Sequence, residues 1–303
     1  MGHVVDVIGP DRFRTFPCPS YPEIRLALFP RRRLGRMIAA FMPAHLHIAT
    51  EGPLGQAARA WAIRNRAHFT TAFHTRFAEY LQVRTGIPTR LSYAWLRRFH
   101  GAADGTMVAT ASLRRDLEMG GFRNIRPWSR GVDLDLFHPE PRETFDLPRP
   151  IFLYVGRIAV EKNIAAFLDL DLPGSKVVVG DGPQLAALRR QYPAITFTGP
   201  RYGAALARMY AGADVFVFPS RTDTFGLVLL EAMACGTPVA AYPVTGPLDV
   251  LTDPRVGAMA EDLRAAALLA LQGDRAACRA HAERFSWRAS AEAFLQNLEL
   301  LHA

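Results

Sequence analysis

The stretch PSRTDTFGLVLLEAMACGTPVA, from Pro219 to Ala240, says more about the fold than any other part of the chain. It holds two carboxylates eight positions apart, Asp223 and Glu231, with Gly226 between them. The apolar run from Leu227 to Cys235 predicts a helix that ends at the glycine after it. We therefore expect one acid in a loop, a glycine where the loop meets the helix, and a second acid about one turn inside the helix.

Short apolar strands alternate with helical segments along the second half of the chain. The expected strands are residues 151–155, 176–179, 195–197, 215–218 and 238–241, and the expected helices are residues 165–168, 184–191, 202–210 and 227–235. Alternation of this kind predicts a parallel sheet with helices on both faces. Because such sheets bind ligands at the carboxyl ends of their strands, we expect the chemistry to lie in the strand-to-helix loops.

The first half follows the same pattern less regularly. We expect strands at residues 44–49, 68–73 and 106–110, a helix at residues 54–65, and a helix that runs through Glu118. Four prolines between Phe137 and Pro150 predict a stiff, non-helical connector. The prediction is an α/β fold with two domains, residues 1–140 and 141–285, followed by a C-terminal helix over residues 286–303 that packs back towards the first domain.

Length and composition narrow the class of protein. The chain has 303 residues, half of them hydrophobic, which suits two domains of ordinary size. No apolar run approaches the roughly 20 residues that span a bilayer, and no secretory signal is visible at the start. Three widely spaced cysteines, Cys18, Cys235 and Cys278, have no metal-ligand pattern. We interpret them as inert thiols in a reducing cytosol, and expect a cytoplasmic protein.

The positive charge is concentrated in the first half. The first 150 residues hold 22 Arg and no Lys against 13 acids, while the remainder holds 14 basic residues against 15 acids. This charge is either a solvated face or a surface for an acidic partner. Arg31–Arg33 with Arg36, and Arg97–Arg98 beside Trp95 and Phe99, favour contact with anionic lipid at a membrane surface. We do not expect nucleic-acid binding, because no recognised motif accompanies the charge.

Two loops of the second half are candidates for binding phosphate. Gly156 and Arg157 follow the first strand, and Lys162 comes five residues later, so both cations can converge on a diphosphate at a helix start. The alternative is an ordinary surface ion pair between Glu161 and one of the bases. The turn Gly180–Asp181–Gly182 follows the next strand and lets the backbone approach a ligand, although many turns look the same.

The opening stretch complements these cations. Gly226 lets the main chain come close to negative groups near a helix start, and the carboxylates of Asp223 and Glu231 are good acceptors for sugar and ribose hydroxyls. Together they suit a sugar nucleotide. The alternative, that both acids are ordinary charges at a helix start, fits Asp223 alone but not Glu231, which interrupts an apolar run.

Taken together, the segments resemble the retaining family-4 glycosyltransferases of the GT-B fold, which has two facing Rossmann-like domains. The matching segments cover most of residues 120–303: GRIAVEKN, VVGDGP, FTGP, PSRTDTFGLVLLEAMACGTPVA and FSWRASAEAFLQNL. The first half adds TEGPLGQAAR, TAFHTRFAEYL and SRGVDLDLFHP, which resemble the subgroup of bacterial GDP-mannose-dependent mannosyltransferases and glycolipid-forming enzymes.

The resemblance implies roles for individual residues. Arg157 and Lys162 would hold the diphosphate, Asp223 the hydroxyls of the donor sugar, and Glu231 the ribose. His74 would lie across the cleft near the reacting sugar, unless it is simply a satisfied histidine at a strand end. The remaining donor-binding positions would be Thr224, Phe225, Gly226 and Leu227 for the sugar and phosphates, Gly199 and Pro200 for the base, and Gly156, Gly180, Asp181 and Gly182 for close backbone approach.

Two departures from the family pattern stand out. The family more often has Glu where this chain has Asp223, which leaves the donor open between GDP-mannose and a UDP-hexose. The chain also begins with GHVVDVIGPD, which resembles the second strand of such enzymes. We therefore expect the N-terminal domain to lack its usual first strand, glycine loop and helix, either as a fragment or as a natural short form.

These features predict transfer of a hexosyl group from a nucleoside diphosphate to an acceptor hydroxyl with retention of configuration. No D-x-D-like motif sits in a suitable loop, so we expect no metal and no other cofactor. The expected acceptor is a lipid or lipid-linked glycan, reached by peripheral contact with the inner face of the cell membrane. Two alternatives stay open: a sugar-nucleotide epimerase of similar fold, and a binding module without catalytic activity.

Overall fold

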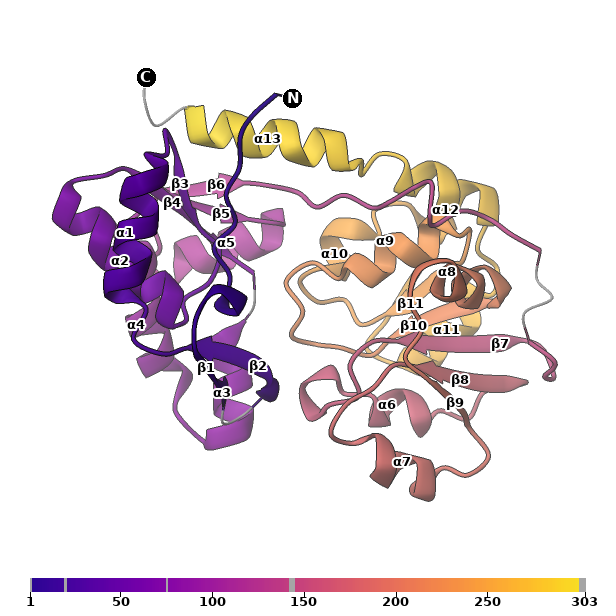
Figure 1. Ribbon diagram of the computed structural model, residues 1–303. Coiled ribbons are helices and arrows are strands. Elements are labelled where there is room, and N and C mark those ends of the chain that lie inside the picture. Colours follow the sequence, from indigo (N-terminus) through magenta and orange to yellow (C-terminus); the bar gives the residue numbers. More distant parts are fainter. Residues whose placement is uncertain (1, 19–20, 75, 142–144, 300–303) are drawn as a thin grey trace. The chain divides into compact units, whose positions relative to one another are not determined.

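Two separate parallel sheets organise the chain (Figure 1). The computed structural model describes residues 2–18, 21–74, 76–141 and 145–299. By their contacts the residues form two compact units. Unit 1 holds the residues up to Ala109, Arg114–Pro127 and the chain from Phe294 onward, and unit 2 holds Thr110–Leu113 and Trp128–Ala293. Each unit is described by itself below.

The sheet of unit 2 has six parallel strands in the order β12-β11-β10-β7-β8-β9. Along the chain, β8 and β9 are added on one side of β7. Strands β10, β11 and β12 are then added on the other side of β7. The order therefore reverses between β7 and β10, where open α/β sheets bind their ligands. The strands are β7 Ile151–Val155, β8 Ser175–Val179, β9 Thr196–Gly199, β10 Val215–Phe218, β11 Val239–Ala241 and β12 Gly257–Met259.

Helices cover both faces of this sheet, so β7 and β10 are buried along their whole length. On one face Phe152 and Val215 pack in a core with Phe167 of α6 and Ala266 of α11. On the other face the ring of Tyr210 in α8 contacts Phe216 of β10. The helices are α6 Ala165–Leu168, α7 Leu185–Gln191, α8 Gly203–Gly212, α9 Leu227–Ala234, α10 Pro247–Val250, α11 Leu263–Ala270, α12 Arg275–Ala282 and α13 Trp287–Glu299, the last running on into unit 1, with 3-10 helices at Val160–Lys162 and Pro254–Val256.

Helix α9 forms as its sequence predicts. It starts after Gly226, whose φ of 82° is favourable for glycine, and ends before Gly236, whose φ of 75° is typical of a helix C-terminus. Leu229, Leu230 and the small residues that follow are buried, so the helix is anchored by its apolar side chains. The expected parallel sheet of the second half is confirmed, with strand ends within two residues of the predicted ones.

Unit 1 has a four-stranded parallel sheet in the order β3-β4-β5-β6 and a separate antiparallel pair, β1 and β2. The strands are β1 Thr15–Cys18, β2 Tyr21–Ala27, β3 Leu46–Ile48, β4 Phe69–Phe73, β5 Gly105–Val108 and β6 Ile125–Pro127. The helices are α1 Arg31–Phe41, α2 Pro53–Asn65, α3 Phe77–Thr85, α4 Thr89–His100 and α5 Ala111–Met119, with a 3-10 helix at Pro10–Arg12.

The strand expected in GHVVDVIGPD is wrong. Residues 2–9 form no strand, and the 3-10 helix follows them directly. The valines at positions 4, 5 and 7 are 76–85% exposed, so alternation of apolar residues here reflects no buried face. A strand needs a partner for its backbone groups, and within the described residues this segment pairs with none.

Helix α4 corrects the expectation that Trp95 and Phe99 both lie at a surface beside Arg97 and Arg98. Phe99 is buried and stacks on Trp95, so only Trp95 of these two aromatic residues is available to a surface, with 42% of it exposed. Leu91, one turn earlier, is also exposed, as are Arg97 and Arg98. None of the helices in the described part of the chain combines the length and the apolar character that crossing a membrane requires.

Candidate functional site

The candidate residues of unit 2 come from loops at the carboxyl ends of neighbouring strands. Arg157 and Lys162 follow β7, and Asp223 follows β10, so all three leave the sheet where its strand order reverses. Strands β7 and β10 are hydrogen-bonded neighbours, with Val215 opposite Phe152. The topology thus brings together two loops that lie about sixty residues apart in the sequence.

Side chains join these two loops directly. The amide of Asn163 donates a hydrogen bond to the carbonyl oxygen of Pro219 at 3.0 Å, and the hydroxyl of Thr222 donates to the carbonyl oxygen of Glu161 at 3.2 Å. The ammonium of Lys162 lies 2.5 Å from Oδ1 of Asp223. A cation of the loop after β7 therefore forms an ion pair with a carboxylate of the loop after β10.

The second carboxylate oxygen of Asp223 is in an unusual position. Oδ2 is buried and has no hydrogen-bond partner within the described residues. Leaving a buried acceptor unsatisfied costs about 1–3 kcal/mol. A ligand hydroxyl that donated a hydrogen bond to Oδ2 would remove this cost, so the oxygen is suited to binding a polyhydroxylated ligand.

The guanidinium of Arg157 is held near the same turn. Its Nε lies 3.8 Å from the carboxylate of Glu161, whose side chain is only 2% exposed. The hydroxyl of Tyr154 donates to the carbonyl oxygen of Arg157 at 2.7 Å and fixes the backbone there. The alternative was a surface ion pair between Glu161 and one of the bases. The structure does pair Glu161 with Arg157, but the Glu161 side chain is buried and does not lie at the surface.

The loops after β7 and β8 pack so closely that Gly180 and Gly182 leave no room for a side chain. A Cβ atom on Gly180 would lie 1.9 Å from the carbonyl oxygen of Gly156, and one on Gly182 would lie 2.3 Å from that of Ile158. The amide of Ile158 also donates to the carbonyl oxygen of Asp181 at 2.8 Å. The two loops thus pack backbone against backbone, which holds the Arg157 turn in place.

The end of β9 is more open. Gly199 accepts a hydrogen bond from the amide of Gly180 at 3.1 Å, and its φ is 75°. A Cβ atom at this position would meet nothing within 4 Å, and Pro200 is exposed. The described residues therefore leave space beside this turn.

Glu231 is partly enclosed on α9 and has a partner that the sequence did not suggest. The hydroxyl of the fully buried Tyr210 donates to its Oε2 at 2.9 Å. Burial raises the pKa of the Glu231 carboxyl above its ordinary value, and the hydrogen bond from Tyr210 opposes this rise. The side chain is therefore oriented by Tyr210 and poorly solvated, which strengthens any hydrogen bond that it accepts.

The joint before α9 leaves backbone donors available. Thr224 and Phe225 are buried, and the ring of Phe225 packs edge-on against Phe285. Gly226 is in the left-handed region, and Leu227 is the first residue of the helix. The amide of Leu229 already donates to the carbonyl oxygen of Gly226 at 2.9 Å. The amides before it in the first turn have no partner within the helix and carry partial positive charge, so they suit an anionic group.

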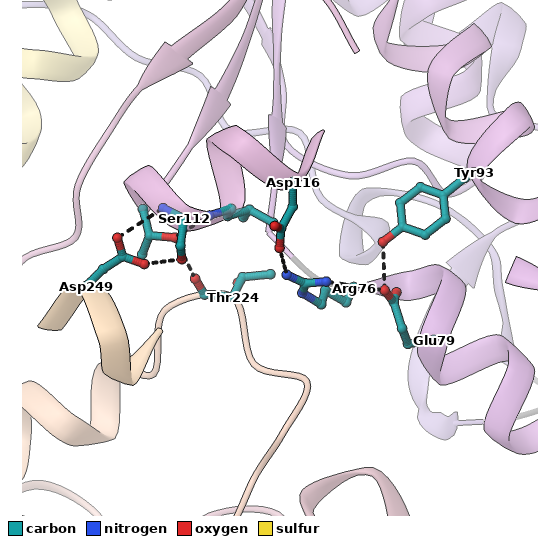
Figure 2. A network of polar contacts seen from close by, with 9 residues as sticks. Arg76, Glu79, Tyr93, Ser112, Asp116, Thr224 and Asp249 are labelled. Atoms are coloured by element: carbon teal, nitrogen blue, oxygen red, sulfur yellow. Dashed lines mark hydrogen bonds and ion pairs between the residues drawn. The ribbon is translucent and has the colours of Figure 1, made fainter. Parts of the chain in front are cut away.

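His74 belongs to unit 1, whereas the other candidate residues belong to unit 2. It lies directly after β4 and is half-buried. Two residues later Arg76 forms an ion pair with Asp116 of α5 at 2.5 Å, and the hydroxyl of Tyr93 in α4 donates to Glu79 of α3 at 2.7 Å (Figure 2).

Arg76 and Glu79 are also joined, at 3.5 Å, so the four side chains form one network. Burial and the neighbouring Glu79 raise the pKa of Tyr93. The network joins the residue before α3 to helices α3, α4 and α5. Sequence reasoning missed it, because its members are far apart in the sequence and share no motif.

One hollow of the described residues lies away from the candidate residues. This hollow of about 480 Å³ beside β12 is mainly apolar and contains none of the candidate residues. Within the described residues, no group of three or more His, Cys, Asp or Glu side chains could hold a metal ion.

Comparison with known proteins agrees with these observations. Residues 2–136 match the family model described as Glycosyltransferase Family 4, and residues 149–272 match Glycosyl transferases group 1. The chain is 35% identical over 289 residues to a GDP-mannose-dependent alpha-mannosyltransferase of Mycolicibacterium smegmatis, an alignment that covers 84% of this chain and 75% of that protein. The chain belongs to the group 1/family 4 glycosyltransferases. It is therefore an enzyme of the hexosyltransferase class, with a nucleotide sugar as donor.

Other relatives of this glycosyltransferase differ in their named activities. It is 33% identical over 269 residues to the sulfoquinovosyl transferase SQD2 of Arabidopsis thaliana, covering 80% of this chain but only 51% of that protein. Among solved structures, sucrose-phosphate synthase of Thermosynechococcus elongatus has a TM-score of 0.72 at 23% identity, covering 91% of this chain and 81% of its own. TarM of Staphylococcus aureus has a TM-score of 0.70 at 17% identity, covering 91% and 60%. The structural matches, together with the two parallel sheets, confirm the expected GT-B fold.

Proposed function

We propose that this glycosyltransferase transfers a hexosyl group from GDP-mannose or a UDP-hexose to a hydroxyl of a membrane lipid or lipid-linked glycan, with retention of anomeric configuration. The observation that carries the proposal is the pairing of Lys162 with Asp223 at the reversal of the strand order, in a loop that also carries Arg157. The loops after β7 and β10 thus supply two cations and a carboxylate with a buried, unsatisfied oxygen. Cations suit the diphosphate, and the carboxylate suits the sugar hydroxyls attached to it.

Each residue then has a defined task. Arg157, Lys162 and the first amides of α9 stabilise the negative charge that grows on the departing diphosphate. Asp223 accepts hydrogen bonds from the sugar, and Glu231, oriented by Tyr210, accepts them from the ribose. The turn at Gly199 and Pro200 faces the base.

The remaining step concerns the acceptor, whose hydroxyl attacks on the face that the diphosphate leaves, while a phosphate oxygen helps to remove its proton. The two cations take the place of a divalent ion, so activity should survive a chelator. Loss of transfer with EDTA and recovery with Mg²⁺ would refute this part.

The names of relatives support the choice of donor and acceptor. Besides the mannosyltransferase of M. smegmatis, a GDP-mannose-dependent alpha-(1-6)-phosphatidylinositol dimannoside mannosyltransferase of Mycobacterium tuberculosis is 31% identical over 220 residues and is covered over 57% of its length. The name of that enzyme describes a lipid acceptor. Because the chain has Asp223 where the family more often has Glu, both donor classes are kept in the proposal.

The donor site is tested by measuring sugar transfer with purified protein, GDP-mannose or UDP-glucose, and a membrane extract. We expect Arg157→Ala and Lys162→Ala each to lower turnover by about 10²- to 10³-fold or more, since each removes a stabilising cation. Arg190→Ala is the matched control, because Arg190 is an exposed arginine of α7 in the same unit. Near-normal turnover of both site variants would overturn the proposed leaving-group site.

Contact with an anionic membrane is the second part of the proposal. Leu91 and Trp95 are exposed one turn apart on α4, and Arg97 and Arg98 extend the same helix. An apolar pair flanked by cations suits the boundary between lipid head groups and acyl chains. The enzyme would then work at the cytoplasmic face of the cell membrane, where its lipid acceptor is found.

This part is tested by sedimentation with vesicles of phosphatidylglycerol and phosphatidylcholine at low and high salt. We expect salt-sensitive binding that Trp95→Ala combined with Arg98→Glu weakens about 10-fold or more, since each surface cation contributes about 1 kcal/mol. Arg190→Glu changes the charge equally on unit 2 and should leave binding unaltered. An absence of binding at low salt would contradict the membrane contact.

A further inference from the structure

A buried histidine in unit 1 holds a carboxylate that the donor site does not use. Nε2 of His100, at the end of α4, lies 3.2 Å from Oε1 of Glu51. Nδ1 of the same ring lies 2.9 Å from the hydroxyl oxygen of Thr71 in β4, which lies 3.1 Å from that of Thr106 in β5. The histidine side chain is 1% exposed, whereas that of Glu51 is 21% exposed. The ring is therefore part of the core, while its carboxylate partner reaches solvent.

The place of Glu51 in the fold is informative. Ile48 of β3 pairs with Thr71 of β4, and Glu51 and His74 each follow this pair by three residues. Both residues therefore leave neighbouring parallel strands at the same carboxyl edge of the sheet. This is the edge at which α/β sheets bind ligands.

The loop that carries Glu51 is held by close packing. The side-chain amide of Gln56 donates to the carbonyl oxygen of Glu51 at 3.2 Å. A Cβ atom on Gly55 would lie 1.8 Å from the carbonyl oxygen of Thr50, so α2 rests directly on the loop. The backbone of Glu51 is thus held by α2, and its carboxylate is held by the ring of His100.

Only one oxygen of this carboxylate is used by the protein. The structure records no partner for Oε2 of Glu51 among the described residues, and this oxygen is not buried. A carboxylate oxygen accepts hydrogen bonds from hydroxyl groups and donates none. The net contribution of one hydrogen bond such as that between His100 and Glu51 to stability is modest, because both groups are hydrogen-bonded to water in the unfolded chain. A binding role accounts better for such a pair at this edge than stability does.

We infer that Glu51 binds a hydroxyl of the acceptor, in the sugar or glycerol part of its head group, and that His100 is the positioning residue that orients the carboxylate. The inference rests on the proposed function, because it assigns the acceptor to a side chain of unit 1. One oxygen of Glu51 stays with His100, and the other accepts a hydrogen bond from the acceptor hydroxyl.

The test compares Glu51→Gln, Glu51→Asp and His100→Asn with the intact enzyme. Transfer from GDP-mannose or UDP-glucose is measured with octyl α-mannoside and with dioctanoylglycerol, which represent the sugar and glycerol head groups. We expect Glu51→Gln to raise KM for the acceptor about 10- to 100-fold, with the donor KM unchanged. Glu51→Asp keeps the charge but loses reach, and His100→Asn loses orientation, so both should have smaller effects of the same kind.

A matched control lies at the other end of the same strands. Asp104 precedes β5 and pairs with His68, which precedes β4, at 3.1 Å. Asp104→Asn alters a histidine–carboxylate pair of the same unit at the amino edge of the sheet. We expect it to leave both KM values unchanged. A general loss of stability in Glu51→Gln would instead appear as a lower Tm with an unchanged acceptor KM, and this would overturn the inference.

A direct binding measurement separates this inference from the proposed function. Calorimetric titration of octyl α-mannoside and of dioctanoylglycerol is carried out with GDP or UDP present, on the intact enzyme and on Glu51→Gln. Weaker binding to the variant supports the inference even if no transfer occurs, in which case only the proposed reaction fails. Equal binding to both proteins, or a rise in the donor KM in place of the acceptor KM, overturns the role of Glu51.

Discussion

Replacement of Glu231 by glutamine should make the free enzyme more stable and its donor binding weaker. Burial raises the pKa of the Glu231 carboxyl in the folded chain above its ordinary value of 4.5. A carboxyl with a raised pKa contributes stability that is fully present below pH 4.5 and is lost as the pH rises through the folded pKa. Above the folded pKa the protein therefore carries a poorly solvated charge that glutamine would remove.

The size of the effect follows from the contacts. Only Oε2 of Glu231 receives the hydroxyl of Tyr210, and the amide oxygen of glutamine can accept the same hydrogen bond. We expect the variant to have a higher Tm than the unaltered enzyme once the carboxyl is ionised, because glutamine brings no charge into this poorly solvated position. Loss of the charged hydrogen bond to the ribose should weaken binding of GDP or UDP about 10- to 100-fold.

The assay is thermal unfolding followed by fluorescence from pH 4.5 to pH 8, together with calorimetric titration of GDP and UDP. The difference in Tm between Glu231→Gln and the unaltered enzyme should be small at pH 4.5 and grow towards pH 8. Glu283→Gln is the control, because Glu283 is an exposed carboxylate of the same unit, paired with the half-buried Arg279. A variant that is less stable than the unaltered enzyme at pH 8, or that binds both nucleotides normally, would refute the reasoning.

Two further predictions concern buried groups. Tyr210→Phe leaves Oε2 of Glu231 without its hydrogen bond. We expect the free energy of unfolding to fall by about 1–3 kcal/mol at pH 7 and by less at pH 4.5, where more of the carboxyl is protonated. Equal losses at the two pH values would contradict this prediction. Burial raises the pKa of the Cys235 and Cys278 thiols to about 12, so iodoacetamide at pH 8 should modify only the half-exposed Cys18 in the folded protein and all three thiols after denaturation. Rapid modification of either buried thiol, measured by mass spectrometry, would show that its surroundings are open to solvent.

Much of unit 2 could be predicted from local sequence. The strand of β7 and the helix α9 are marked by apolar runs that end at glycines, and these signals lie within a few residues of the elements they define. The same residues predicted the candidate phosphate-binding loop at Arg157 and the acids at positions 223 and 231. The strand expected from the resemblance of GHVVDVIGPD failed, because its valines are exposed and its backbone pairs with no strand of the described residues.

The sequence by itself determined the parallel α/β architecture, the family, and which loops hold the candidate donor-binding groups, because periodicity and glycine positions are local properties of the chain. Tertiary structure alone decided the partners of those groups. Lys162 meets Asp223 across 61 positions, Tyr210 meets Glu231 across 21, and His100 meets Glu51 across 49. Such pairs arise from strand order and helix packing, and a side chain carries no local signal of the neighbour that folding will bring to it.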